Sequence, residues 1–377
     1  MLRHDGGRET LLGRPSPAGS GGGWNPDDAS GVRESAMGLL PVTLKLLRLA
    51  AACVLLLVAC TSGTKTSSAR GSVTSPPSPP SMPAVPSASP DEPTGPPIRV
   101  SQLKGRVAFD CGSDVCIADV DGSRLRRVTH RKGPEFDATW SPDGTQIAYR
   151  DSTHGINNND EIYVVNADGS GRRNLTRSPS NEWGPDWSSD GRSIAYSSNV
   201  QLYVMRPDGT HPRPITDVEA EYPSWSPNGR SLVFMSAQPD ARGSDPNYDV
   251  FVVRLNGAGL TQLTDWPGED GWPAWSPNGK WIAFTTTHDA HGRRMGGFPC
   301  RTIYLMRPDG TGKRRLVTGL AAEMPAWAPD GRTIVFTGTR LFGHDRTSLW
   351  VIRLDGSGLR PLSIRGWLPD WVSDAGS

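Results

Sequence analysis

The 377-residue sequence lacks an excess of charge of either sign and any long apolar run, and it has only five cysteines. Its 40 lysines and arginines balance 39 aspartates and glutamates. Proteins that hold nucleic acid or anionic lipid by bulk charge need a clear basic excess, so this composition excludes both modes of binding. The mean hydropathy of −0.45 excludes a polytopic membrane protein.

The abundant residues indicate a fold rich in turns. There are 43 glycines, 34 prolines and 13 tryptophans. Glycine and proline form turns, and aromatic residues recur periodically in all-β repeat folds. The composition therefore favours an all-β protein with repeated aromatic anchors.

The first 60 residues predict an export signal rather than a folded domain. Residues 1–36 are rich in glycine and arginine without periodicity, which indicates a disordered segment or a start assigned too early, before Met37. In residues 37–60, Lys45 and Arg48 precede an apolar run of 11 residues. A membrane-spanning helix needs about 20 residues, whereas the core of a signal peptide needs about 7–15.

The apolar run ends in Leu-Val-Ala-Cys at residues 57–60, which resembles the lipobox of bacterial lipoproteins. The resemblance implies that the signal is cut before Cys60, whose thiol then carries a lipid. The alternative is an ordinary signal peptide or a short anchor with an incidental cysteine. Residues 61–99 contain ten prolines and nine serines, and we expect this stretch to be a disordered stalk.

Residues 100–377 are built from a repeat. Its first motif is Trp-Ser-Pro-Asp-Gly. Its second motif, which alternates with the first, is a short apolar run leading to Asp-Gly or Asn-Gly. Copies of the first motif, some of them altered, begin at Trp140, Trp187, Trp225, Trp275 and Trp327, with a weaker copy at Trp371. Six units of about 46 residues are typical of β-propeller blades, each a meander of four antiparallel strands.

The two ends of the repeat complete one another. The first unit begins at Arg106 with its second strand, and residues 367–371 supply an extra first strand. Pairing these strands closes the ring and removes a free sheet edge. We therefore predict an all-β, six-bladed propeller of four-stranded antiparallel blades, closed by its N- and C-terminal strands.

The paired motifs resemble the TolB-type, WD-repeat-like β-propeller repeat over about residues 100–377. The resemblance implies a propeller fold and the binding of partner peptides at the mouth of its channel. The resemblance does not extend before residue 100, where we expect the stalk rather than the α/β domain of TolB-type proteins.

Loops of unequal length predict which face binds a partner. The turns after the first and third strands of each unit are short, whereas residues 150–161, 237–249 and 287–302 form long connections on the other face. Variable loops on a regular scaffold commonly form binding surfaces. The alternative is that these loops are tolerated insertions.

An acidic residue precedes the repeat tryptophan in five units. It stands four or five positions earlier, and the five residues are Glu135, Glu182, Glu221, Asp270 and Glu323. Because the first strand of a blade is innermost, we expect these carboxylates to surround the channel mouth and attract a cation, an amine or a basic peptide. The alternative is that each carboxylate accepts hydrogen bonds from backbone amides where a loop enters its blade.

Motifs for metal binding and catalysis are poorly organised. His288 and His291 share one loop, and Asp160 lies in an asparagine-rich loop, but neither loop has the spacing of a known metal site. We expect no cofactor, with a divalent cation as the alternative. The sequence has no Gly-x-Ser-x-Gly nucleophile motif. A metal-dependent hydrolase or lyase of an envelope carbohydrate or lactone and a non-catalytic scaffold stay open as alternatives.

The cysteines fit an exported protein. Cys111 and Cys116 flank a four-residue hairpin loop, which predicts a disulfide in an oxidising compartment, and Cys300 is left over. Together these patterns predict a monomeric lipoprotein on the outer face of the cytoplasmic membrane or in the periplasm or cell envelope. We expect it to bind an envelope protein or peptide, and no nucleic acid, rather than to catalyse a reaction.

Overall fold

The computed structural model describes residues 96, 98–130, 133–152, 159–239, 246–290, 294–295, 298–340 and 347–374. The predicted start, the signal with Cys60 and nearly all of the predicted stalk lie outside these residues. In the described part of the chain, no helix has both the length and the apolar character needed to cross a bilayer.

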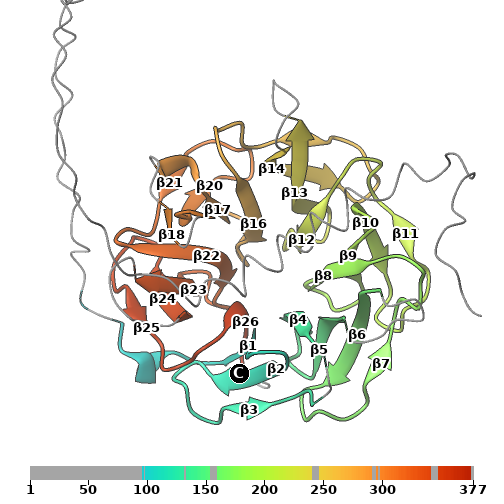
Figure 1. The fold of residues 1–377 in the computed structure, drawn as a ribbon, viewed down its shortest axis with the longest axis horizontal. Helices are drawn as coiled ribbons and strands as arrows, with labels where there is room; N and C mark the ends of the chain where they lie inside the picture. Colours follow the sequence, from blue (N-terminus) through green and yellow to red (C-terminus); the bar gives the residue numbers. More distant parts are fainter. Residues whose placement is uncertain are drawn as a thin grey trace, which may run out of the picture. The chain divides into compact units, whose positions relative to one another are not determined.

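The described strands form six antiparallel sheets of four strands each, arranged as blades around a central axis (Figure 1). Strands a to d of a blade run from the axis outward. Blade one contains β26 (Trp367–Val372), β1 (Arg106–Asp110), β2 (Val115–Asp119) and β3 (Arg126–Arg127); blade two contains β4 (Glu135–Trp140), β5 (Gln146–Asp151), β6 (Glu161–Asn166) and β7 (Arg173–Asn174); blade three contains β8 (Glu182–Trp187), β9 (Ile194–Ser198), β10 (Gln201–Met205) and β11 (Arg213–Pro214).

The other three blades follow the same order. Blade four contains β12 (Glu221–Trp225), β13 (Ser231–Pro239), β14 (Pro246–Arg254) and β15 (Thr261–Gln262); blade five contains β16 (Asp270–Trp275), β17 (Ile282–Thr286), β20 (Thr302–Met306) and β21 (Arg314–Arg315); blade six contains β22 (Leu320–Trp327), β23 (Thr333–Arg340), β24 (Ser348–Arg353) and β25 (Arg360–Pro361). A short hairpin of β18 (Arg294–Met295) and β19 (Phe298–Pro299) lies between β17 and β20. The prediction of an all-β, six-bladed propeller is confirmed.

Blade one closes the ring by joining the two ends of the repeat. Strand β26 pairs antiparallel with β1, so that Trp371 lies opposite Val107 and Val372 opposite Arg106. Blade one is thus the blade in which strand a comes from the far end of the chain (Figure 1). The predicted closure is confirmed.

The repeat motif forms the turn between strands a and b. In blade two, Ser141 Oγ donates to Asp143 Oδ1 at 2.6 Å, and the same oxygen accepts the amide of Thr145 at 3.0 Å. Gly144 follows with φ of 66°, a conformation that glycine adopts without steric cost. This hydrogen-bonded turn explains why Ser-x-Asp-Gly recurs after the tryptophan.

The hydrophobic core lies between neighbouring blades. Strand b of five blades contributes an aromatic side chain that is at most 1% exposed, namely Phe109, Tyr149, Phe234, Phe284 and Phe336. Repeat tryptophans connect the blades by hydrogen bonds as well as by packing. The indole N–H of Trp225 donates to the carbonyl of Asp186 in blade three at 3.1 Å, and that of Trp327 donates to the carbonyl of Ala274 in blade five at 2.9 Å.

The folded part of the chain begins before residue 100. Ile98 is 3% exposed and belongs to the core between blades six and one. Arg353 donates to the carbonyl of Pro96 at 2.7 Å, and Arg360 donates to the carbonyl of Ile98 at 2.8 Å. We call residues 98–103, which include the short helix η2 (Val100–Gln102), the strap. The apolar side chain of Ile98 explains why packing starts before residue 100, where the end of the proline- and serine-rich stretch placed the boundary.

Candidate binding site at the central channel

Every inner strand contains a bulge three residues before the repeat tryptophan. At this position φ lies between 46° and 58° in all six blades, and the residues are Asp137, Gly184, Tyr222, Trp272, Met324 and Leu368. The pairing of strands a and b is interrupted at the same place in each blade. A bulge redirects the side chain that it carries, and all six of these residues line the channel. We call them the upper ring, because strand a enters from the long-loop face.

The channel contains a cavity of about 360 Å³. Below the upper ring, the residue directly before each tryptophan also lines it; this lower ring consists of Thr139, Asp186, Ser224, Ala274, Ala326 and Asp370. Proline stands between the two rings in five blades, at residues 185, 223, 273, 325 and 369. The cavity is therefore walled by proline and tryptophan rings and by one variable residue per blade at each level.

Three lower-ring side chains accept a backbone N–H from the next blade. The amide of Trp140 donates to Asp370 Oδ2 at 2.7 Å, and that of Trp225 donates to Asp186 Oδ2 at 2.8 Å. In the same way, the amide of Trp275 donates to Ser224 Oγ at 3.1 Å. Burial raises the pKa of Asp186 to about 8 and also raises the pKa of Asp370.

Four of the five predicted carboxylates are buried rather than open to the channel. Glu135 and Asp270 are 0% exposed, and Glu182 and Glu221 are 1% and 7% exposed. None of the five predicted residues is among those that line the cavity. Desolvation raises the pKa of these four buried carboxyls to about 7. The structure therefore places them inside the blades, beside the channel wall, and their role in binding stays a prediction.

Two of these carboxylates, Glu182 and Glu323, contact other side chains, whereas the carboxylate oxygens of Glu135 and Asp270 have no hydrogen-bond partner among the described residues. Glu182 accepts hydrogen bonds from the hydroxyls of Ser178 and Ser198, whereas the alternative prediction named backbone amides. Glu323 differs from the other four because it is paired with Arg301 at 3.2 Å. Arg301 also contacts Glu269 at 2.8 Å, and its guanidinium lies 5.1 Å from the centre of the Trp272 ring.

A second partly buried arginine lies behind the upper ring in blade two. Arg150 is paired with Asp137 at 3.2 Å and with Asp160 at 3.5 Å, and its guanidinium lies 5.0 Å from the centre of the Phe136 ring. Burial raises the pKa of Asp137, while Arg150 opposes this rise. Asp160, predicted as a weak cation ligand, thus serves as a partner of Arg150.

The predicted histidine pair is only partly described. His288 is exposed and stacks on Trp266 with ring centres 4.4 Å apart, while His291 lies outside the described residues. Within the described ranges, no group of three or more histidine, cysteine, aspartate or glutamate side chains is placed to hold a metal ion.

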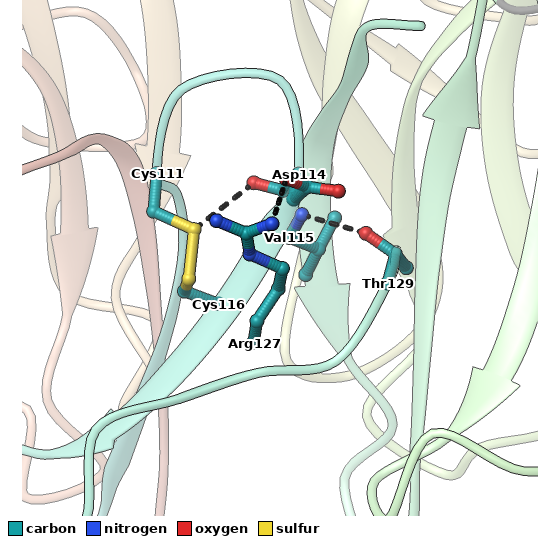
Figure 2. Close-up of a disulfide and its surroundings, with 6 residues drawn as sticks. All are labelled: Cys111, Asp114, Val115, Cys116, Arg127 and Thr129. Carbon is teal, nitrogen blue, oxygen red and sulfur yellow. Dashed lines mark hydrogen bonds and ion pairs between the residues drawn. A yellow bond between two sulfur atoms is a disulfide. The ribbon is translucent and has the colours of Figure 1, made fainter. Parts of the chain in front are cut away.

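A disulfide lies on the long-loop face of blade one (Figure 2). It joins Cys111 and Cys116 across the hairpin between β1 and β2. Asp114 in this hairpin is paired with Arg127 of β3 at 3.2 Å. The hairpin of the closing blade is thus tied to itself and to the outer strand. Cys300 takes no part in this bond and is half-buried.

Comparisons with known proteins agree with this architecture. The family model of the Tricorn protease N-terminal β-propeller domain matches residues 99–244. The crystal structure of TolB from Acinetobacter baumannii superposes with a TM-score of 0.57 at 21% identity, over 71% of this chain and 66% of that one. The chain has the fold of the TolB propeller.

Two curated TolB proteins are similar in sequence over a shorter stretch. The Tol-Pal system protein TolB of Zymomonas mobilis is 39% identical over 79 residues, and that of Rhizorhabdus wittichii is 36% identical over 78 residues. Each stretch covers 20% of this chain and only 16% or 17% of the relative. The match thus spans about a sixth of the length of these TolB proteins.

Sequence reasoning missed the residues that form the channel wall of the propeller. It followed the acidic residues that recur, whereas the upper and lower rings vary from blade to blade. A signal was present in the sequence, because proline recurs two residues before the tryptophan and marks the interrupted strand. The residues on either side of that proline are the ones that face the cavity.

Proposed function

We propose that this TolB-type propeller is held in the cell envelope by a lipid on Cys60 and binds an envelope protein or peptide. Binding takes place at the long-loop face and the mouth of the channel. Similarity to proteins of the Tol-Pal system supports an envelope role. The lipobox-like sequence and the proline-rich segment after it support a tethered protein.

The observation that carries the proposal is the apolar part of the upper ring. Tyr222 and Trp272 lie with ring centres 6.1 Å apart and are both partly exposed at the channel. Met324 and Leu368 continue this surface on the next two blades. Partly exposed aromatic side chains beside a cavity are typical centres of protein recognition.

Cross-linking and affinity capture from intact envelopes would test the proposal. The variant Tyr222→Gly/Trp272→Gly removes both rings at positions where φ is 50° and 46°. Glycine suits this conformation, and Gly184 already occupies the equivalent position of blade three. Leu125→Ala, at a side chain that is 59% exposed on another part of the surface, is the matched control.

We expect the wild-type protein and the control to capture the same partner and the double variant to lose it, while its urea unfolding shows that it is folded. Equal capture by the double variant would move the binding surface away from the channel mouth. If the wild-type protein captures no partner, the binding proposal is overturned.

The lipid anchor has its own test. A bacterial host fed with an alkyne fatty acid should label the wild-type protein and should not label Cys60→Ala. Cys300→Ala serves as the control and should be labelled like the wild type. Labelling that persists in Cys60→Ala would refute the assignment of the lipid to this cysteine.

A further inference from the structure

The channel wall has two unlike halves. Inner strands β26, β4 and β8 are neighbours and contribute carboxylates, namely Asp370, Asp137 and Asp186. Inner strands β12, β16 and β22 contribute uncharged side chains to the same two rings, namely Tyr222, Ser224, Trp272, Ala274, Met324 and Ala326. The residues that line the cavity include no lysine or arginine.

The two carboxyl groups of the lower ring are not required by the repeat. Ser224 accepts the backbone amide of the next blade's tryptophan with a neutral hydroxyl, as Asp186 and Asp370 do with a carboxylate. Ala274 and Ala326 occupy this position without any acceptor on the side chain. Since the fold accepts all these residues, the two carboxylates add a property that folding does not demand.

The carboxylate above them has unused bonding capacity. The side chain of Asp137 is 4% exposed and lines the cavity. Its Oδ2 contacts Arg150 and accepts the amide of Gly184, but its Oδ1 has no hydrogen-bond partner. A buried carboxylate oxygen without a donor is costly to the folded state.

We propose that the channel receives a lysine or arginine side chain of the bound partner, with its cationic group at Asp186 and Asp370 and its aliphatic part against Tyr222 and Trp272. This inference rests on the proposed binding function. The acidic half of the wall supplies charge-assisted acceptors, and the aromatic half supplies apolar surface and rings that attract cations. A long basic side chain combines both requirements, because it carries a charge at the end of a hydrophobic stem.

The electrostatics of the channel wall support the same conclusion. Burial raises the pKa of Asp186, and repulsion from Asp370 adds to this rise. A cation placed between the two carboxylates would favour their charged forms, which desolvation otherwise disfavours.

Defined peptides would test the proposal with the complete chain. The probes are capped pentapeptides Gly-Gly-x-Gly-Gly in which x is lysine, arginine, norleucine or glutamate, measured by tryptophan fluorescence or calorimetry up to about 10 mM. The key variant is Asp186→Asn/Asp370→Asn, which keeps an acceptor for the amides of Trp225 and Trp140 but removes both charges. Asp208→Asn, in an exposed turn, is the control.

We expect the lysine or arginine peptide to bind at least about tenfold more tightly than the norleucine peptide, and the double variant to lose this preference. Norleucine binding equal to lysine, a preference retained by the double variant, or no binding by any peptide would overturn the inference. Urea unfolding of the double variant separates loss of binding from loss of fold. If the double variant still captures its envelope partner, the binding function stands and the basic side chain does not.

Discussion

Blades one and four come from the same repeat but are completed in different ways. Blade four uses consecutive strands, from β12 to β15, whereas blade one joins β26 from the end of the chain to β1 near its beginning. Short connections join the strands of blade four. In blade one, the pairing of β26 with β1 must also offset the entropy of closing the long loop that contains the rest of the propeller. Blade one also has a disulfide in its first hairpin, and the strap packs where it meets blade six. Reinforcement is therefore concentrated in the blade whose strands are not consecutive in the chain.

Removal of the closing tryptophan should have the largest effect. Trp371→Ala should lower the free energy of unfolding by about 3–5 kcal/mol, because it leaves a cavity and removes the bond from the indole N–H to the carbonyl of Lys104. Trp225→Ala in blade four is the matched comparison. Urea unfolding should show the larger loss for Trp371→Ala, and a smaller loss there would contradict the view that closure makes blade one more sensitive.

Loss of the strap's apolar anchor should come next. Ile98→Ala should cost about 2–3 kcal/mol, since Ile98 is 3% exposed in the core between blades six and one. Differential scanning calorimetry would measure the change, with exposed Leu125→Ala as a control that should leave the melting temperature nearly unchanged. Equal melting temperatures for both variants would show that the strap does not stabilise the ring.

Reduction of the disulfide should cost about 2 kcal/mol, because the bond closes a short loop in the unfolded chain. Cys111→Ser/Cys116→Ser should unfold at the same urea concentration with and without dithiothreitol. The wild-type protein should match this variant only when reduced. A wild-type midpoint that dithiothreitol does not move would refute a stabilising role for this bond.

The buried carboxyls should make the blades less stable at high pH. The pKa of Glu182 is raised from its ordinary value of 4.5 to about 7, so the folded state holds a proton that the unfolded state has lost. Stability from this proton is complete below pH 4.5 and is lost as the pH rises to about 7. Glu182→Gln should therefore stabilise the protein at pH 8 by on the order of 1–2 kcal/mol relative to wild type, and by much less at pH 4.5.

Urea titrations at both pH values would measure this difference. The exposed residue Glu219 supplies the control variant Glu219→Gln, which should leave the pH dependence unchanged. A Glu182→Gln variant with the same pH dependence as wild type would show that this carboxyl ionises in the folded state as it does in the unfolded chain.

The sequence was sufficient to predict the fold because the fold depends on residues that recur. The tryptophan, the Asp-Gly turn and the orphan strand at residues 367–371 each identify a local structure, and together they determine the number of blades and the closure. The site was harder because its residues do not recur. Asp186 and Ala274 occupy the same position in different blades, so repetition could not identify either as part of the channel.

Burial was the second property that the sequence did not reveal. Glu135 and Asp270 are the first residues of the inner strands β4 and β16, and whether a carboxylate points to the channel or into the blade depends on its register with respect to the bulge. That bulge arises from a positive φ at Asp137 and Trp272, and the identity of these residues does not predict a positive φ. Three-dimensional coordinates were needed to separate the buried carboxylates from those that line the cavity.

The prolines of the inner strands limit how a guest chain can be held in the channel. In five blades proline leaves no N–H at the middle of strand a, and the amides of Trp140, Trp225 and Trp275 already donate to neighbouring blades. A peptide that enters therefore finds no row of free donors with which to extend a sheet. Such a peptide cannot bind by adding a strand to a blade (β-augmentation). Its side chains, rather than backbone hydrogen bonds, must therefore determine which sequences the channel binds.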